Sequence, residues 1–349
     1  FIPKKCYFSL NLFYLSPNNA TMEFSQDQAL QLACEKLMKS GASKENALPL
    51  AKGIIDAENQ GIKSHGFHYL PIYCLHLKCQ KVNGDAAPSI TTISQSAFKV
   101  DADNGFAHRA IDLAFDKLIS SAQEFGIASV GIQKSYNCGV LGYHTKNLAL
   151  HGLVGIGFTN APASIAPAGG TKATVGTNPF SIAVPVNGEV KLIIDQSASV
   201  VAKSEISVRA KNNESIPEGW AYGPDGKTTT DAKVALTGTM APSGGYKGFG
   251  VGLLVEIMAA CLGGGMLGTK ASSFANDVGG PPSTGQFFIA FNPEKFNENF
   301  NTQINTLLHS IESQEGARTP GSSRMKNFEK NKNLPISIKE ALFETISKI

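Results

Sequence analysis

The sequence of 349 residues predicts a mixed α/β (α+β) fold, for three reasons. Its first part has the periodicity of helices, whereas short runs of β-forming residues alternate with helices after residue 86. From Leu153 onward, strands separated by Gly, Pro and Asn predominate. Because strands and helices do not alternate regularly, the pattern disfavours the doubly wound parallel sheet of a Rossmann domain.

The first lobe is expected to hold three helices. Ser25 and Gln28 have the spacing of a capping box, which predicts a helix that begins there and ends at Gly41. A second helix is expected over about residues 43–59, ahead of the helix breaker Gly61. Apolar residues at helical spacing predict a third helix, which carries Leu70, Cys74 and Leu77.

Further elements are expected where periodic runs are bounded by turn residues. Helices are expected at 107–125, 249–262 and 296–313, the last of which closes the chain, and strands at 96–101, 127–133, 154–158, 180–184, 190–194 and 287–291. Two packed lobes are expected, because 349 residues are more than one hydrophobic core usually serves.

The first residues need a separate interpretation. Residues 1–21 begin without Met and carry an apolar stretch behind Lys4 and Lys5, which resembles a short signal peptide. Asn11 interrupts that stretch, and Met22 stands directly before the first predicted helix. We therefore expect Met22 to be the true start, and residues 1–21 to be a leader or a disordered tail.

Charge and cysteine content exclude several classes of protein. A formal net charge of +3, without a stripe of Lys and Arg, makes a nucleic-acid partner unexpected. The six cysteines form no CxxC pair and have no metal-ligand spacing with histidine, so no metal site is expected. Free thiols are typical of a reducing compartment, and we expect a cytoplasmic protein. No membrane span is expected, because no run reaches about 18 apolar residues.

One glycine-rich string could be mistaken for a dinucleotide motif. Residues Gly263 to Gly268 satisfy GxGxxG, but in a Rossmann unit this string follows a strand and opens a helix. Here it follows the apolar helix predicted to end near Leu262. We expect these glycines to terminate that helix and to make no contact with a cofactor.

The tripeptide Ser64-His65-Gly66 is the strongest candidate for chemistry. An imidazole has a pKa of about 6.5, so it can hold and release a proton near neutral pH. Ser64 could orient the ring by a hydrogen bond, and Gly66 would let a ligand approach the backbone. In the alternative interpretation, Ser64 only caps the third helix and His65 is a surface residue.

Several glycine-rich segments gather in the middle of the chain. Such segments expose amides, and a lysine at a helix start adds charge, so together they could hold a phosphate. They are Gly139-Val140-Leu141-Gly142, Ala166-Pro167-Ala168-Gly169-Gly170, Gly176-Thr177-Asn178-Pro179 and Gly244-Gly245-Tyr246-Lys247-Gly248.

These segments and Ser64-His65-Gly66 resemble motifs of the malate/L-lactate dehydrogenase type 2 family. That family includes ureidoglycolate, sulfolactate and diketogulonate dehydrogenases and the reductase of piperideine- and pyrroline-2-carboxylate. The resemblance covers about residues 23–320 and keeps the motif order. The other matching stretches are Asp103-Asn104-Gly105-Phe106, Thr159-Asn160-Ala161, Ile216-Pro217-Glu218-Gly219-Trp220 and Asp225-Gly226-Lys227-Thr228-Thr229-Thr230-Asp231.

The resemblance implies a non-Rossmann fold, in which a large, mostly antiparallel sheet binds NAD or NADP, and a homodimer. It implies a helical lobe at 22–90, joined by residues 300–349, and a cofactor and substrate domain at 91–299. His65 would be the proton donor and Ser64 its partner, and Tyr69 and Thr177 would face the substrate. The residues placed at the cofactor are Asn137, Cys138, Gly139, Val140, Leu141, Asp195, Gln196, Ser197, Lys247, Arg318 and Arg324.

Two residues depart from the family pattern. The family usually has Asn-His-Phe-Gly where this chain has Tyr136-Asn137-Cys138-Gly139, so the histidine is replaced by Asn137. It commonly has arginine where this chain has Tyr69. An arginine fork suits a carboxylate, whereas a phenol offers one neutral hydrogen bond. Compensation by His68, Lys203 or a residue of a partner subunit stays open.

The expected function is therefore that of an NAD(P)-dependent oxidoreductase that interconverts a small 2-oxo acid and its 2-hydroxy acid. Malate, lactate and sulfolactate are examples of such substrates. The alternative within the family is a reductase of the cyclic imines Δ1-piperideine-2-carboxylate and Δ1-pyrroline-2-carboxylate. A non-catalytic nucleotide-binding protein is a third possibility, which the presence of Ser64 and His65 disfavours.

Overall fold

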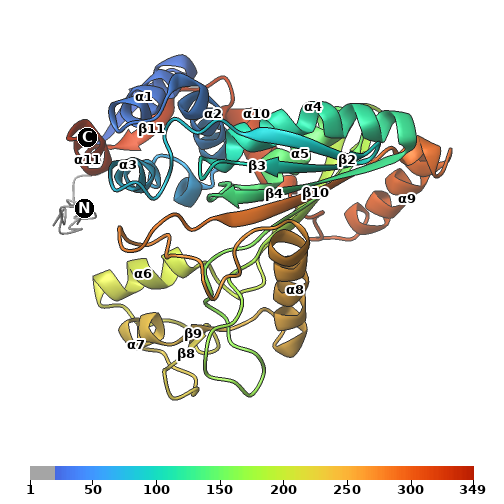
Figure 1. Ribbon diagram of the computed structural model, residues 1–349. Coiled ribbons are helices and arrows are strands. Elements are labelled where there is room, and N and C mark those ends of the chain that lie inside the picture. The colour runs from blue at the N-terminus through green and yellow to red at the C-terminus, as the bar shows by residue number, and fades with distance from the viewer. Residues whose placement is uncertain (1–19) are drawn as a thin grey trace.

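The structure is a computed structural model that describes residues 20–349. A seven-stranded sheet forms its centre (Figure 1). Every neighbouring pair is antiparallel except β3 and β4, which confirms the expected mostly antiparallel sheet. In order across the sheet, the strands are β2 (Ser89–Ser94), β3 (Ala97–Asp101), β4 (Ile127–Ser135), β10 (Thr284–Phe291), β5 (Val154–Thr159), β6 (Phe180–Val186) and β7 (Glu189–Gln196).

Both faces of the sheet are covered. Helices α4 (Ala107–Phe125) and α5 (Leu141–Leu150) pack on one face, α4 against β4 and α5 against β5 and β6 (Figure 1). Adjacent residues of the central strand β10 serve opposite faces, as the pleat requires. Phe288 packs in the core beneath α4, whereas Phe287 packs with Val255 on the other side.

The helical lobe is built as the periodicity predicts. Ser25 and Gln28 form the predicted capping box at the start of α1, and Gly61 ends α2 in the left-handed conformation that glycine favours. A second, two-stranded sheet ties the two ends of the described chain together on this lobe. The elements of the helical lobe are α1 (Gln26–Lys39), α2 (Lys44–Gln60), α3 (Leu70–Lys78), β1 (Thr21–Phe24), β11 (Ile336–Lys339) and α11 (Glu340–Ser347).

The start of the chain is only partly described. Residues 1–19 of the predicted leader lie outside the described residues. Thr21, which the prediction also assigned to the leader, is the first residue of β1 and pairs with Lys339 of β11. The strand β11 has only four residues, which is too short for a sequence pattern to reveal.

The closing helix was predicted wrongly. Helix α9 (Phe300–Glu312) begins later than residue 296, lies against β6 and is followed by three further elements. The first of these, α10 (Ser322–Asn331), packs on α2 of the helical lobe. Its sequence SSRMKNFEKN has only two apolar residues, Met325 and Phe328, which is too weak a pattern to mark a helix, so the prediction missed it.

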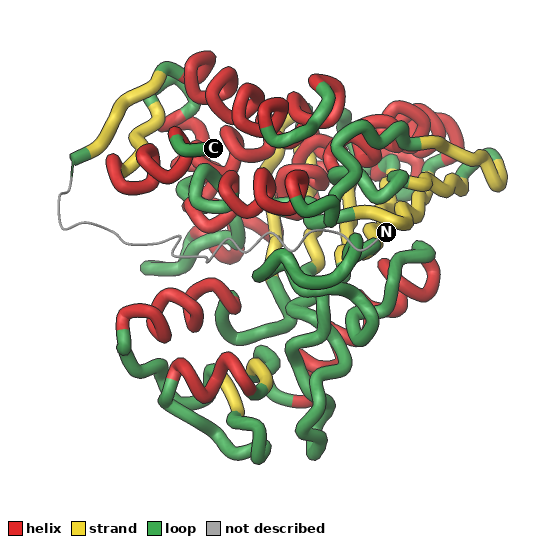
Figure 2. Tube along the Cα trace, turned by 60° about the vertical axis from the view of Figure 1, so that its left-hand side comes forward, coloured by secondary structure: helices red, strands yellow, loops and turns green. Residues whose placement is uncertain are grey.

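A smaller unit packs on the sheet face opposite α4. It is built largely of loops, as the lower part of Figure 2 shows, around a core that includes Ile165, Ile206 and Met240. Its regular elements are α6 (Lys203–Asn212), β8 (Ala221–Tyr222), α7 (Ala232–Thr237), β9 (Thr239–Met240) and α8 (Tyr246–Glu256).

The long apolar helix expected at 249–262 has two parts. Helix α8 begins at Tyr246, and residues Ile257–Leu262 continue as a π-helix. At the junction lies Glu256, whose buried carboxylate accepts hydrogen bonds from Asn160 Nδ2 at 3.3 Å, Asn178 Nδ2 at 2.8 Å and Gly268 N at 2.6 Å. A buried carboxylate is tolerated only when such donors satisfy it. Two family-like motifs and the GxGxxG string therefore converge on one structural carboxylate.

The GxGxxG string ends the π-helix, as predicted. Gly263 follows the last helical residue, and Gly264 has a positive φ of 85°. A Cβ on Gly265 would lie 2.4 Å from the backbone N of Gly285 in β10, so the string must pass very close to the sheet. Within residues 20–349, no helix is both long and apolar enough to span a bilayer.

Replacing Gly264 with Ala should destabilise the fold and leave cofactor affinity unchanged. The positive φ costs a Cβ-bearing residue about 1–2 kcal/mol, and the new Cβ would lie 2.8 Å from Gln133 Oε1. Thermal unfolding and cofactor titration measure the two effects. Gly250→Ala is the control, because its Cβ meets nothing within 4 Å. A tenfold weaker cofactor Kd at unchanged Tm would contradict the assignment.

Candidate active site

Ser64 and His65 lie on a short 3₁₀ helix, Lys63–His65, between α2 and α3. Ser64 Oγ is 3.0 Å from His65 Nδ1, so the predicted hydrogen bond between them is present. The alternative, in which Ser64 caps the third helix, is wrong because α3 begins at Leu70 with Tyr69 as its N-cap.

Glu58 of α2 gives this turn its shape. Its buried carboxylate accepts a hydrogen bond from the Phe67 amide at 2.8 Å and pairs with Lys63. A Cβ on Gly66 would lie 2.1 Å from Glu58 Oε1, so only glycine fits beside this carboxylate. The glycine of Ser64-His65-Gly66 is therefore explained by packing.

The charges of Asp195 and Arg324, which come from distant parts of the chain, act on His65. Burial lowers the pKa of His65 below its usual 6.5, Asp195 opposes this shift and Arg324 adds to it. Asp195 lies near the end of β7, and Arg324 lies in the first turn of α10. Their side chains pair at 2.9 Å.

The segment that leads into α5 joins this group through its backbone. Asp195 Oδ2 accepts a hydrogen bond from Gly142 N at 3.2 Å, and Asn137 Oδ1 accepts one from Gly139 N at 2.7 Å. Gly139 has a φ of 66°, which lets the segment turn sharply. The side chain of Val140, the N-cap of α5, makes no hydrogen bond. The next amides are already used, since Gly142 N donates to Asp195 and Tyr143 N donates to the Val140 carbonyl oxygen at 3.0 Å. The group that could attract a nucleotide phosphate here is therefore the Arg324 guanidinium.

The two departures from the family pattern lie side by side. Tyr69 hydrogen-bonds the side chains of Asn137 and Tyr136, and its hydroxyl lies 3.5 Å from the carbonyl oxygen of Phe274. Burial raises the pKa of Tyr69, so its phenol stays neutral. The two replaced residues, Tyr69 and Asn137, thus contact each other. Asn137 begins the segment 137–142, whose last residue donates to Asp195.

The remaining predicted residues are more dispersed. The carbonyl of Thr177 accepts a hydrogen bond from Ala198 N at 2.8 Å, and Ser197 Oγ lies 2.8 Å from Ser199 Oγ. Gln196 and Lys247 are exposed, the latter on the first turn of α8. Arg318 is exposed and contacts Ser323 Oγ at 3.4 Å, in the loop that precedes α10.

The residues offered as compensation for the lost arginine lie in different places. His68 is held near Glu58 and Lys63, and burial lowers its pKa. Lys203 begins α6, and desolvation lowers its pKa. Cys138 is buried, its carbonyl accepts a hydrogen bond from His144 Nε2 at 2.9 Å, and burial raises the pKa of its thiol to about 12.

The sequence analysis assigned Asp195 to the cofactor and missed its electrostatic effect on His65. The only sequence signal was an acidic residue at the end of a strand, and nothing local connects β7 with the turn before α3. Within residues 20–349, no cluster of three His, Cys, Asp or Glu could hold a metal ion.

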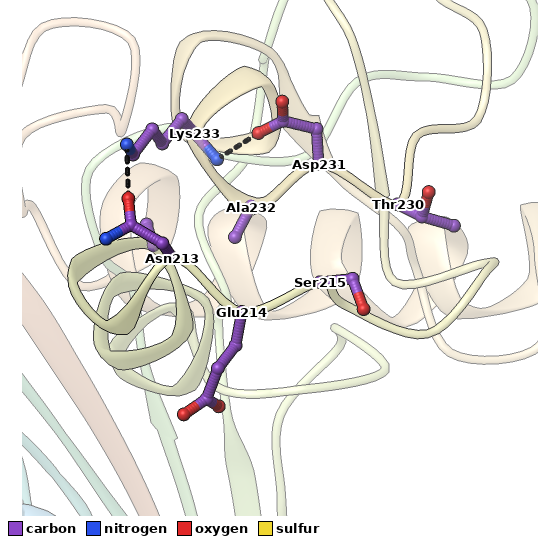
Figure 3. Close-up of a pocket in the computed structure, with 8 residues that line it drawn as sticks. Asn213, Glu214, Ser215, Thr230, Asp231, Ala232 and Lys233 are labelled. Carbon is purple, nitrogen blue, oxygen red and sulfur yellow. Dashed lines mark hydrogen bonds between the residues drawn. The ribbon is translucent and has the colours of Figure 1, made fainter.

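An open pocket lies elsewhere, between α6 and α7 (Figure 3). In it, Lys233 donates a hydrogen bond to Asn213 Oδ1 at 2.6 Å, and the Lys233 amide donates to Asp231 Oδ1 at 2.7 Å. None of its lining residues is a predicted site residue. The polar lining residues are exposed, and Lys233 bonds Asn213 and Asp231, so this pocket offers no chemistry comparable to that around His65.

Comparison with known proteins identifies the family. Residues 24–347 match the family described as malate/L-lactate dehydrogenase. A (2R)-3-sulfolactate dehydrogenase (NADP(+)) of Chromohalobacter salexigens is 38% identical over 297 residues, which cover 85% of this chain and 89% of that protein. A Delta(1)-pyrroline-2-carboxylate reductase of Ancylobacter novellus is 33% identical over 322 residues, which cover 91% and 94%.

Solved structures agree. The delta1-piperideine-2-carboxylate reductase of Pseudomonas syringae has a TM-score of 0.88 at 28% identity, over 94% of this chain and 99% of that one. The sulfolactate dehydrogenase of Methanocaldococcus jannaschii has a TM-score of 0.84 at 30% identity, over 94% and 96%. The predicted resemblance, fold and enzyme class are confirmed: the chain belongs to the malate/L-lactate dehydrogenase family and is an oxidoreductase.

Proposed function

We propose that this enzyme is an NAD(P)-dependent oxidoreductase that interconverts a small 2-oxo acid and its 2-hydroxy acid, with His65 as the proton donor in reduction. The observation that carries the proposal is the position of His65. It is hydrogen-bonded to Ser64, partly buried, and its pKa responds to the charges of the Asp195–Arg324 pair. The relative named as an NADP(+)-dependent sulfolactate dehydrogenase supports the same substrate class.

Each polar side chain of the site has a separate role in the transfer of one proton to the substrate. A bound nicotinamide would supply the hydride. His65 would give a proton to the substrate heteroatom, which becomes negative as it is reduced. Ser64 fixes the ring through Nδ1 and leaves Nε2 for the substrate. Asp195 stabilises the protonated imidazole and Arg324 destabilises it, so the pair sets how readily the proton leaves.

For the cofactor, NAD or NADP, we propose the predicted set of residues. The Arg324 guanidinium would bind phosphate, since it joins charge to oriented donors. Lys247 and Arg318 are exposed and could add charge. Thr177 and Tyr69 are proposed to face the substrate.

The second candidate function is reduction of a cyclic imine that carries a 2-carboxylate. The neutral pair Tyr69 and Asn137 favours it, because a ring without a second acidic group needs no cation there. The Ancylobacter novellus relative and the Pseudomonas syringae structure are named as such reductases. Oxidation of NADH and NADPH by the purified protein with pyruvate and oxaloacetate, or with the two cyclic imines, decides between the two. Absence of turnover with all four would contradict both.

We also propose a cytoplasmic homodimer. Helix α8 and the π-helix after it carry exposed apolar side chains at spacings of seven, eight and eleven residues, which place them on one helix face. Such a contiguous apolar face marks a protein–protein contact. The residues are Tyr246, Leu253, Leu254 and Ile257.

Replacing His65 with Ala should reduce kcat for reduction by about 10²–10⁴-fold, the usual contribution of a positioned acid. Ser64→Ala should cost less, since it only loosens the ring. The rate should fall as pH rises through the pKa of His65, and because that pKa is lowered, the fall should lie below pH 6.5. Steady-state kinetics across pH measure this. His309→Ala, an exposed histidine of α9, is the control. A near-normal kcat in His65→Ala would assign the proton to another group.

Arg324 and Asp195 should shift this pH profile in opposite directions. Arg324→Gln removes a charge that lowers the pKa of His65, so the falling limb should move to higher pH. Asp195→Asn removes a charge that raises it, so the limb should move to lower pH. Both are measured at saturating cofactor, with Arg209→Gln on α6 as the control. Shifts in the same direction would show that charge does not set the pKa.

Leu254→Glu should convert the dimer to monomer, because it buries a charge in the proposed contact. Light scattering should give twice the chain mass of 36.9 kDa for the wild type and that mass for the variant. Val208→Glu on α6 is the matched control, since Val208 is 52% exposed and Leu254 is 50% exposed. A dimeric Leu254→Glu would exclude this face.

A further inference from the structure

Glu58 is a buried acid at an electrostatically unfavourable place. It lies in the last turn of α2 and is 5% exposed. The C-terminal end of a helix carries the negative end of the helix dipole, and the last turn of α2 holds no basic residue. Burial of the carboxylate adds to this cost. The contacts that offset the cost are made with the turn that follows α2.

The two carboxylate oxygens of Glu58 hold both ends of this active-site turn, residues 63–67. Oε2 pairs with Nζ of Lys63, which begins the 3₁₀ helix. Oε1 accepts a hydrogen bond from the Phe67 amide at 2.8 Å, and the Phe67 side chain is buried in the core of the helical lobe. Ser64 and His65 therefore lie between the two points that the carboxylate fixes.

The hydrogen bond from Phe67 also ends the 3₁₀ helix. Inside the turn, Gly66 N donates to the Lys63 carbonyl oxygen at 3.1 Å, which is the i to i−3 pattern of such a helix. By the same pattern the Phe67 amide would donate to Ser64, but it donates to Glu58 Oε1 instead. The carboxylate therefore ends the helix directly after the candidate acid.

The side chain of Glu58 is in close contact with the active-site turn. A Cβ on Gly66 would lie 2.1 Å from Glu58 Oε1, 2.6 Å from Cδ and 2.9 Å from Cγ. The end of the Glu58 side chain thus packs directly on the residue that follows His65. Closely packed interiors transmit displacement, so a shift of this carboxylate must shift the turn as well.

We propose that Glu58 is a positioning residue that holds His65 where it can give its proton to the substrate. This deepens the proposed function and rests on it. Glu58 acts through the backbone that carries Ser64 and His65. A proton donor must lie within about 2.6–3.2 Å of its acceptor, and a misplacement of about 1 Å can cost about 100-fold in rate.

Glu58→Gln tests the proposal, because it keeps the volume of the side chain and removes the charge that holds Lys63. Its kcat for reduction, measured well below its unfolding temperature, should fall by about tenfold or more at unchanged cofactor Kd. Asp56→Asn is the matched control, since Asp56 is also buried near the end of α2 but pairs with Lys146 of α5 at 2.5 Å. Both variants should lower Tm, and only Glu58→Gln should lower kcat.

The His65→Ala background shows whether Glu58 acts through His65. Where the acid is absent, its position has no effect on the rate, so Glu58→Gln should not lower kcat further in the double variant. A merely structural Glu58 would lower kcat by the same factor in both backgrounds. Equal factors would therefore overturn the proposal.

Lys63→Met decides the matter where Glu58→Gln fails to fold. The side chain of Lys63 is 51% exposed, so the fold should tolerate its replacement, while the carboxylate loses one of its two contacts at the ends of the turn. The kcat should again fall, and only where His65 is present. In that case an unchanged kcat in Lys63→Met overturns the proposal.

The outcomes separate the positioning role from the proposed function. A folded Glu58→Gln with the kcat of the wild type overturns the positioning role and leaves the oxidoreductase function standing. A near-normal kcat in His65→Ala overturns both the assignment of the acid and its positioning by Glu58. Failure of the wild type to oxidise NADH or NADPH with every acid and cyclic imine overturns the proposed function itself.

Discussion

The carboxylate of Asp195 is the interaction on which the candidate site depends. It receives the Arg324 guanidinium at 2.9 Å and the Gly142 amide at 3.2 Å, and its charge acts on His65. The strand β7, the start of α5, the start of α10 and the turn before α3 are thus brought to one place. A partly buried carboxylate is stable only when cations and hydrogen-bond donors compensate it. The contacts of Asp195 therefore hold these elements in position.

A second buried carboxylate organises the other face of the sheet. Glu256, at the junction of α8 and the π-helix, is satisfied by Asn160, Asn178 and the Gly268 amide. Asn178 directly follows Thr177, the proposed substrate contact. These two asparagines, which belong to motifs that resemble those of the family, therefore stabilise the fold. Their chemical effect is indirect, because they hold the neighbouring backbone in position.

Buried polar groups also join the loop before β10 to the helical lobe and to the sheet. The Asn276 carbonyl oxygen accepts hydrogen bonds from Lys81 Nζ at 3.0 Å and from His76 Nε2 at 2.9 Å, so His76 Nδ1 accepts from the Tyr136 hydroxyl. The same groups pack as aromatic rings, for example Tyr136 on Phe274 at 5.2 Å and Tyr69 on Tyr73 at 4.7 Å. Packing and polarity therefore support one another at this place.

The sequence by itself determined the local features and the identity of the reactive group. Capping at Ser25, the left-handed end at Gly61, all strands of the sheet except β2 and the Ser64–His65 pair are set by neighbouring residues, so they could be predicted. Only the tertiary structure decided that Asp195 and Arg324 act on His65, that Tyr69 meets Asn137, and that the polar helix α10 packs on α2. These contacts join segments far apart in the chain, and they depend on how buried charges are satisfied, which no local pattern records.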